Sequence, residues 1–209
     1  MVEQGSPEWH AMRAGKVTAS KLADLLAKTK TGWGASRANY MAQLVAERLT
    51  GQVADSFKSP AMEWGTATEA EARQTYEFYQ DCIVAPVDFV PHPTIPMSGA
   101  SPDGLLGTDG VLELKCPNTS THIETLLGQS VPGKYMWQVQ WQLACTGRRF
   151  ADFVSFDPRM PEEMRLFVRR VDRDDEMISE ATKQVIAFLA EVDEKVAQLT
   201  RLYRMAEAA

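Results

Sequence analysis

Cysteine is scarce in this sequence. Only three are present, Cys82, Cys116 and Cys145, and they are widely spaced. An odd number of distant cysteines offers neither a disulfide framework nor a paired C-x-x-C metal site. We therefore expect buried thiols in a protein that works in a reducing compartment.

The sequence also lacks a long apolar run. No stretch approaches the roughly 18 residues of a membrane span, and the start, MVEQGSPEWH, is polar and acidic instead of basic and then apolar. With 209 residues and 44% hydrophobic content, the chain is long enough for one sizeable core. We expect a single soluble, cytoplasmic domain over residues 1–209, with no membrane association.

An excess of positive charge is missing as well, because the net charge is −6. A chain of this charge is not expected to coat DNA nonspecifically. The charge is unevenly placed, however: residues 1–60 carry eight Lys/Arg against five Asp/Glu, whereas residues 61–150 carry five against ten. This layout suits a polyanion-binding arm beside a cation-binding site, and an ordinary solvated surface gives the same counts.

Hydrophobic spacing and turn residues predict helices, then extended segments, then a further helix, two strands and a long final helix. No repeat or low-complexity segment interrupts this order. It predicts the α/β class, with a central mixed β-sheet flanked by helices. The predicted elements are helices at about 21–28, 36–51 and 66–80, an antiparallel meander between 83 and 116, a helix ending at Gly147, strands at 150–156 and 163–171, and a helix from about 174 to 203.

The stretch ASPDGLLGTDGVLELKCP, residues 100–117, combines two carboxylates and a lysine around a glycine-rich turn. Side chains alternate along a strand, so Glu113 and Lys115 project from one face, roughly 6.6 Å apart at about 3.3 Å per residue. Leu112 and Leu114 then point into the core. A buried strand seldom carries a charge pair at the centre of one face, so this face is expected to line a cleft.

Asp103 lies ten residues before Glu113, and a hairpin across GLLGTDG would bring the two carboxylates together. Their repulsion is relieved by a raised pKa or by a divalent cation, and oxygen ligands suit Mg²⁺ or Mn²⁺. The pattern therefore predicts a metal site for phosphodiester cleavage. Lys115 would hold or deprotonate the attacking water, or neutralise charge on the phosphate. The alternative is a surface hairpin with an exposed Glu-Lys pair.

Pro102-Asp103 and Glu113-Leu114-Lys115 resemble the motif of the PD-(D/E)-x-K nuclease superfamily. Nearly the whole chain is similar to the phage alkaline exonucleases of the lambda-exonuclease or YqaJ type. The resemblance implies a restriction-endonuclease-like core. It rests on five stretches in the same order and at similar intervals: WHAMRAGKVTAS (9–20), EWGTATEAEAR (63–73), ASPDGLL and VLELKCPNTS (within 100–120), YMWQVQWQL (135–143) and FDPRM (156–160).

The same resemblance implies the members of the catalytic site. In that family a glutamate on the helix before the strands completes the acidic cluster, and Glu69 occupies its position. Leu114 joins Asp103, Glu113 and Glu69 as metal ligands for one or two Mg²⁺ ions, with Mn²⁺ as a substitute. Gln138 approaches the site, where it would hydrogen-bond a metal water or the scissile phosphate. An exposed helix acid is the alternative reading of Glu69.

The resemblance also implies residues that bind DNA. Arg13 and Ser20 match the positions that recognise a 5′-terminal phosphate, whereas the alternatives are a solvated arginine and a helix N-cap. Tyr135 precedes the catalytic glutamine by one turn and belongs to the same set. Lys30 would track the phosphate backbone, and Met62 would be an apolar wedge between strands. A solvated loop and a core methionine are the alternatives for the last two.

Neighbours of these residues are assigned lesser roles. Arg73 is the expected i,i+4 ion-pair partner of the helix glutamate. Trp137 and Trp141 form a separate helix face that we interpret as core. Gln140 and Gln142 are weaker candidates for any role.

Taken together, the resemblance implies a Mg²⁺-dependent 5′-to-3′ exonuclease. It would digest one strand of linear double-stranded DNA to mononucleotides, leaving a 3′ single-stranded overhang for single-strand-annealing recombination. Its implied partners are DNA ends, a single-strand annealing protein and two further copies in a ring-shaped homotrimer, in the cytoplasm of a bacterial host. Two alternatives stay open: a PD-(D/E)-x-K endonuclease of repair or restriction type, and a non-enzymatic DNA-end binding protein.

Overall fold

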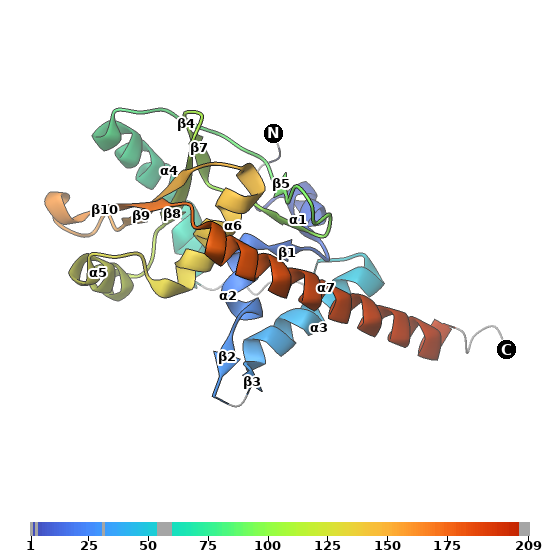
Figure 1. Cartoon of the computed structure of the whole chain (residues 1–209). Coiled ribbons are helices and arrows are strands. Elements are labelled where there is room, and N and C mark those ends of the chain that lie inside the picture. Colours follow the sequence, from blue (N-terminus) through green and yellow to red (C-terminus); the bar gives the residue numbers. More distant parts are fainter. Residues whose placement is uncertain (1, 3, 31, 54–59, 205–209) are drawn as a thin grey trace.

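The computed structural model describes residues 2, 4–30, 32–53 and 60–204 (Figure 1). Its centre is a five-stranded sheet in the order β10-β9-β8-β7-β4. β8 and β9 run parallel and the other neighbours antiparallel, which confirms the predicted mixed sheet. The strands are β4 (Val84–Ala85), β7 (Gly104–Leu106), β8 (Gly110–Lys115), β9 (Phe150–Phe156) and β10 (Leu166–Asp172).

The glycine-rich turn between the two predicted acids closes a hairpin. β7 pairs antiparallel with β8, with Gly104 opposite Leu112. The turn contains Gly107 at a φ of +51°, a conformation that glycine adopts without steric cost. At Gly110 a Cβ atom would lie 2.4 Å from the Phe150 ring, so glycine is required where β8 starts beside β9.

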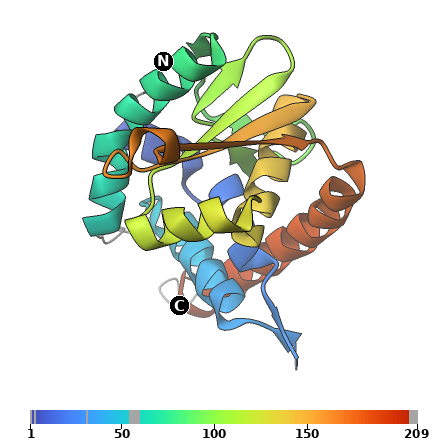
Figure 2. The same ribbon diagram turned by 90° about the vertical axis from the view of Figure 1, so that its left-hand side faces the viewer.

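Helices cover both faces of this sheet (Figures 1 and 2). On one face, the buried Tyr76 of α4 joins Leu112 and Leu114 of β8 in one apolar cluster, as the alternation along β8 predicted. On the other face, Val139 of α6 joins Val111 of β8 in a second cluster. The helices are α4 (Pro60–Gln80), α5 (Thr119–Gly128) and α6 (Gly133–Thr146).

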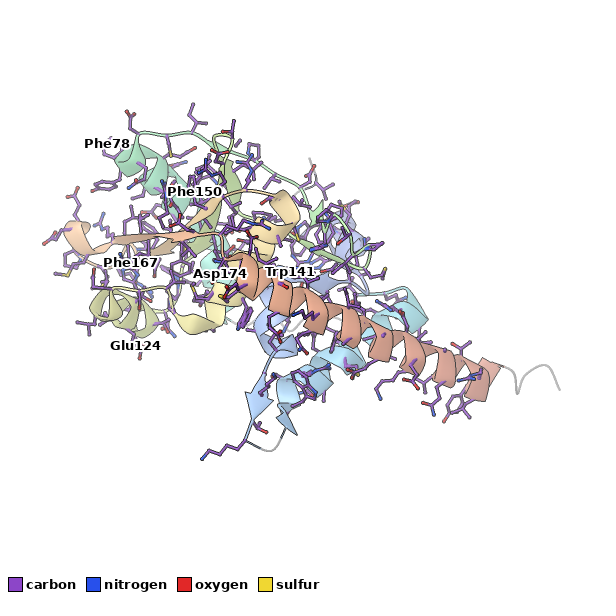
Figure 3. All side chains as sticks on the ribbon, viewed as in Figure 1. Phe78, Glu124, Trp141, Phe150, Phe167 and Asp174 are labelled. Carbon is purple, nitrogen blue, oxygen red and sulfur yellow. The ribbon has the colours of Figure 1, made fainter. Side chains whose placement is uncertain are left out.

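The largest apolar cluster lies between α6 and the helices from the two ends of the chain. Trp141 of α6 is a fully buried member of this cluster (labelled in Figure 3), and Trp137 packs against the cluster, as predicted. α7 also extends past the body of the molecule (Figure 1). The elements around this cluster are α1 (Pro7–Arg13), a 3₁₀ turn η1 (Ala19–Lys21), α2 (Leu22–Leu25), α3 (Ala35–Thr50) and α7 (Asp175–Arg204).

A small second sheet connects the N-terminal helices to the hairpin. Its order is β1-β6-β5, from Val17–Thr18, Ser98–Ala100 and Val90–Pro91. β1 runs parallel to β6, with Thr18 opposite Gly99. The residues that follow these two strands are therefore brought side by side, which matters for the site.

Several elements differ from the predicted ones. The helix expected over 21–28 shrinks to η1 and α2, because the chain then enters a hairpin of β2 (Lys28–Thr29) and β3 (Gly32–Trp33). α4 begins at Pro60 instead of about 66. The extended segments between 83 and 116 are divided between two sheets and do not form one meander.

Three short helical elements were not predicted: α1, α5 and the 3₁₀ turn η2 (Glu162–Met164). α5 is preceded by its N-cap, Asn118, whose side chain accepts a hydrogen bond from Thr121 N at 2.9 Å. The helix is too short to show a clear apolar period. None of the described helices is long and apolar enough to span a membrane. The single domain over 1–209 stays a prediction.

Candidate active site

The hairpin places Asp103 beside Glu113. Continuing the register of β7 and β8 by one residue sets these two positions directly opposite each other, where cross-strand side chains are neighbours. Asp103 Oδ2 accepts a hydrogen bond from Leu114 N at 2.6 Å, and Asp103 N donates to Leu112 O at 3.1 Å. These bonds hold the aspartate against β8, as the turn chemistry predicted.

Both carboxylate oxygens of Glu113 have donors, and the side chain is 1% exposed. Oε1 accepts from Gln138 Nε2 at 2.5 Å and forms an ion pair with Lys115 Nζ. Oε2 accepts from Gln142 Nε2. The two glutamines are four residues apart on α6 and so lie on one helix face. The α6 face therefore closes over Glu113.

Burial, with a smaller contribution from neighbouring carboxylates, opposes ionisation of Asp103 and Glu69. Burial, and then the charge of Glu113, raise the pKa of Asp103 well above its ordinary value. Burial also raises the pKa of Glu69. Burial lowers the pKa of Lys115, but the charges of Glu113 and Asp103 outweigh it and the net shift is upward. Lys115 is thus held as an ammonium, which favours binding a water or a phosphate oxygen over taking up a proton.

Glu69 approaches the pair from α4. The charge of Glu69 contributes to the raised pKa of Asp103. The charge of Glu113 in turn contributes to the raised pKa of Glu69. Arg73 Nη2 lies 3.9 Å from Glu69 Oε1, which is the expected i,i+4 ion pair. The same guanidinium donates to the Asp103 carbonyl oxygen. Arg73 therefore connects α4 to the hairpin and keeps Glu69 near the other acids.

The donor set fits a small hard cation. Asp103 and Glu113 offer two opposed carboxylates, and Mg²⁺ in proteins is commonly bound by one or two carboxylates and several waters. Within the described residues, no three His, Cys, Asp or Glu side chains are close enough together to hold an ion. Leu114 has only its carbonyl oxygen to offer. Ligation by Leu114 and Glu69 stays a prediction.

Arg13, at the end of α1, faces two serines. Its Nη2 lies 3.3 Å from Ser20 Oγ and its Nη1 3.3 Å from Ser101 Oγ. The parallel pairing of β1 and β6 causes this, because the two serines follow those strands. Burial lowers the pKa of Arg13 to about 10, so it remains charged at neutral pH. Ser20 makes no helix-capping bond, so the N-cap alternative is wrong.

The other predicted DNA contacts are more scattered. Tyr135 stacks on Phe153, with ring centroids 5.4 Å apart, and the Nζ of Lys115 lies 5.2 Å from its ring centre. Lys30 is exposed at the tip of the β2–β3 hairpin, away from the acids. Met62 lies in the first turns of α4, but its side chain is outside the described part of the structure. Of Tyr135 and Lys30, only Tyr135 therefore lies beside the hairpin site, next to Lys115.

Sequence reasoning gave little weight to Gln142 and none to Ser101. The signal for Gln142 was its position four residues after Gln138, which places both amides on one helix face. Ser101 stands two residues before Asp103, and only the pairing of β6 with β1 shows that it meets Arg13. Such long-range pairing cannot be read from local spacing.

Comparisons with known proteins place this geometry in a family. The model of the YqaJ-like viral recombinase domain matches residues 8–149. The chain belongs to this family. Among solved structures it is similar to LHK-Exo, an alkaline exonuclease from Laribacter hongkongensis, with 46% identity over 98% of this chain and 100% of that one and a TM-score of 0.89. A comparison with curated protein sequences finds no match.

A second relative extends the likeness of this YqaJ-family chain at the level of fold. A phage related exonuclease from Haemophilus somnus 129PT is 14% identical, covers 91% of this chain and 99% of its own, and has a TM-score of 0.73. The fold is therefore the PD-(D/E)-x-K-like fold of alkaline exonucleases, as the motifs predicted. Together these matches support a nuclease of DNA recombination.

Proposed function

We propose that this YqaJ-family protein is a Mg²⁺-dependent exonuclease that enters at a double-stranded DNA end and digests one strand in the 5′-to-3′ direction. The observation that carries the proposal is the meeting of Asp103, Glu113 and Lys115 on one hairpin, beside the Arg13 cluster. The first group suits phosphodiester cleavage and the second suits a terminal phosphate. The product would be mononucleotides and a 3′ single-stranded overhang.

The cleavage step divides among the residues of the hairpin and α6. A cation held by Asp103 and Glu113 would supply Lewis-acid activation of a water and of the phosphodiester. Lys115 donates to the attacking water or to the charge that develops on the phosphate. Gln138 donates to Glu113 and would also donate to the same phosphate. Tyr135 flanks the Lys115 ammonium and limits where it can move.

The direction of digestion would come from Arg13. A guanidinium binds phosphate through two parallel hydrogen bonds, and two serine hydroxyls already lie at its nitrogens. Only a 5′ end carries an accessible terminal phosphate in ordinary cut DNA. LHK-Exo was crystallised with dAMP, a nucleotide whose phosphate and base are those of a single-nucleotide product. Mononucleotide release is consistent with a related site in this chain.

A duplex labelled separately at each 5′ and 3′ end tests the proposal. With Mg²⁺, we expect a 5′ label to be released as mononucleotide at once, whereas a 3′ label stays on a strand that shortens from its 5′ end. A covalently closed circle should resist cutting. Efficient cutting of the circle would establish the endonuclease alternative, and binding of ends without any product would establish the end-binding alternative.

Replacing Arg13 by alanine is expected to abolish the preference for 5′-phosphorylated over 5′-hydroxyl ends. A charge-assisted bond contributes about 1.5–3 kcal/mol, or roughly 10- to 150-fold in rate ratio. Initial rates on the two kinds of end measure this ratio. The control is Arg149→Ala, which removes the same charge from a side chain that is 80% exposed and should keep the preference. An unchanged ratio in Arg13→Ala would remove Arg13 from the phosphate site.

Partners follow from the same proposal. A 3′ single strand must be protected and paired, so a single-strand annealing protein is the expected consumer of the product. A ring-shaped homotrimer around the duplex is proposed by analogy with the family. The Lys30 hairpin and Met62 remain proposed contacts to DNA. A cytoplasmic location in a bacterial host fits a DNA end as substrate.

A further inference from the structure

The two oxygens of the Glu113 carboxylate are held in unequal surroundings. At Oε1 the donors are Gln138, which is half-buried, and Lys115, whose side chain is 26% exposed. At Oε2 the donor is Gln142, which is fully buried. The donors at Oε1 have room to move and the donor at Oε2 has none.

Gln142 also carries an unsatisfied atom. Its Nε2 donates to Glu113, while its Oε1 is buried without a hydrogen-bond partner. Buried polar atoms are nearly always paired, and an exception calls for an explanation. Turning the amide over would bring its carbonyl oxygen against the carboxylate, two acceptors face to face. The orientation with the unpaired oxygen is therefore imposed by Glu113.

We propose that Gln142 is a positioning residue for the metal site: it fixes Oε2 of Glu113 and leaves Oε1 as the oxygen that meets the cation. This inference rests on the proposed function, because it needs a cation at Asp103 and Glu113. Lys115 and Gln138, which now contact Oε1, would then be the side chains available to donate to the substrate.

The same helix contains a matched control. Gln140 is also a buried glutamine of α6, 2% exposed. Its amide bonds the main chain, with Nε2 donating to Asp172 O at 2.9 Å and Oε1 accepting from Asp174 N at 2.8 Å. Neither of these hydrogen bonds involves an acid of the site. Loss of a buried amide can thus be separated from loss of the bond to Glu113.

The experiment measures Mn²⁺ binding to the full chain by calorimetry without DNA, for wild type, Gln142→Met and Gln140→Met. We expect Gln142→Met to bind Mn²⁺ about 10-fold or more weakly, the usual size of an effect from a group that orients a ligand. Gln142→Met should also raise the Mg²⁺ concentration needed for half-maximal cleavage by a similar factor. At saturating Mg²⁺ its cleavage rate should fall by less than this factor. Gln140→Met should change thermal stability and leave Mn²⁺ affinity as in wild type.

Equal Mn²⁺ affinity in Gln142→Met and wild type would overturn the inference, as would an equal loss in Gln140→Met. If Gln142→Met does not fold, Gln142→Ala, which leaves a cavity and no clash, is measured in its place. Asp103→Asn separates this inference from the proposed function. If wild type binds Mn²⁺ and Asp103→Asn does not, the metal site stands whatever Gln142 does. If Asp103→Asn binds as well as wild type, the proposed metal site itself is wrong, and the inference with it.

Discussion

Lys115→Ala is expected to lower DNA cleavage by about 10³-fold, the middle of the range for a group that assists the reacting atoms. The reason is the Lys115 ammonium beside Glu113 Oε1, which would donate to the attacking water or to the phosphate. Binding of DNA ends should remain largely intact, because Arg13 and its serines are untouched. Initial cleavage rates and end binding, measured with the same labelled duplex, give the two quantities.

Lys134→Ala is the matched control for this prediction. The Nζ atoms of both lysines lie near the same Tyr135 ring, at 5.2 Å for Lys115 and 4.8 Å for Lys134, but only Lys115 contacts Glu113. The control variant should retain most of its cleavage rate. A normal rate in Lys115→Ala would show that the proposed mechanism is wrong, and equal losses in both variants would point to general attraction of DNA.

Asp103→Asn is expected to remove cleavage and yet stabilise the metal-free protein. A cation site contributes several kcal/mol to the transition state, so losing a ligand costs roughly 10³-fold or more in rate. In the metal-free fold, burial and Glu113 raise the pKa of Asp103, so its ionisation opposes folding. The amide removes that repulsion and still offers an oxygen to Leu114 N. Each kcal/mol gained raises Tm by about 2–4 °C for a chain of this size.

The gain in stability expected for Asp103→Asn should depend on pH. A carboxyl group whose pKa is raised in the folded state stabilises the fold below its ordinary pKa of about 3.8 and loses this contribution as pH rises through the raised value. The Tm difference between Asp103→Asn and wild type should therefore grow with pH above about 4, without metal, and shrink when Mg²⁺ is added to wild type. Melting curves in chelator and in Mg²⁺ measure it.

Asp109→Asn is the control on the same hairpin. Asp109 lies at the exposed turn and its only ion pair among the described residues is with Arg149 at 3.7 Å. It should show neither the loss of cleavage nor the pH-dependent gain in Tm. A wild-type Tm that does not fall relative to Asp103→Asn as pH rises would contradict the repulsion inferred at the acids.

Local features of the sequence predicted much of the catalytic half. Alternation along 111–116 separated Glu113 from Leu112, and Gly107 and Gly110 marked the turn, because these are short-range constraints of strand geometry. α6 and α7 were predicted from long apolar periods, and Gly147 ends α6 with a left-handed cap, as expected. Short elements were predicted less well, since α5 offers only ten residues of pattern.

The parts of the site that the sequence did not predict depend on contacts between distant segments of the chain. Two serines 81 residues apart meet at one guanidinium because β1 pairs with β6. Burial of Gln142 against Glu113 depends on how α6 crosses β8, and no single-residue signal encodes that crossing. Family motifs indicated Arg13 and Ser20 without showing why they approach each other. Physical pairing of strands supplies that reason.

The loop from Ser101 to Asp103 has a consequence for the size of the product. Ser101, at one end, contacts Arg13, and Asp103, at the other end, lies opposite Glu113. The two residue steps between them span at most ~7 Å. Pro102 stands between them and stiffens the connection by fixing its φ. A strand of DNA advances about 3.4 Å per nucleotide along its axis. If Arg13 anchors the terminal phosphate as proposed, this loop would hold that phosphate and the bond to be cut only about one or two nucleotides apart.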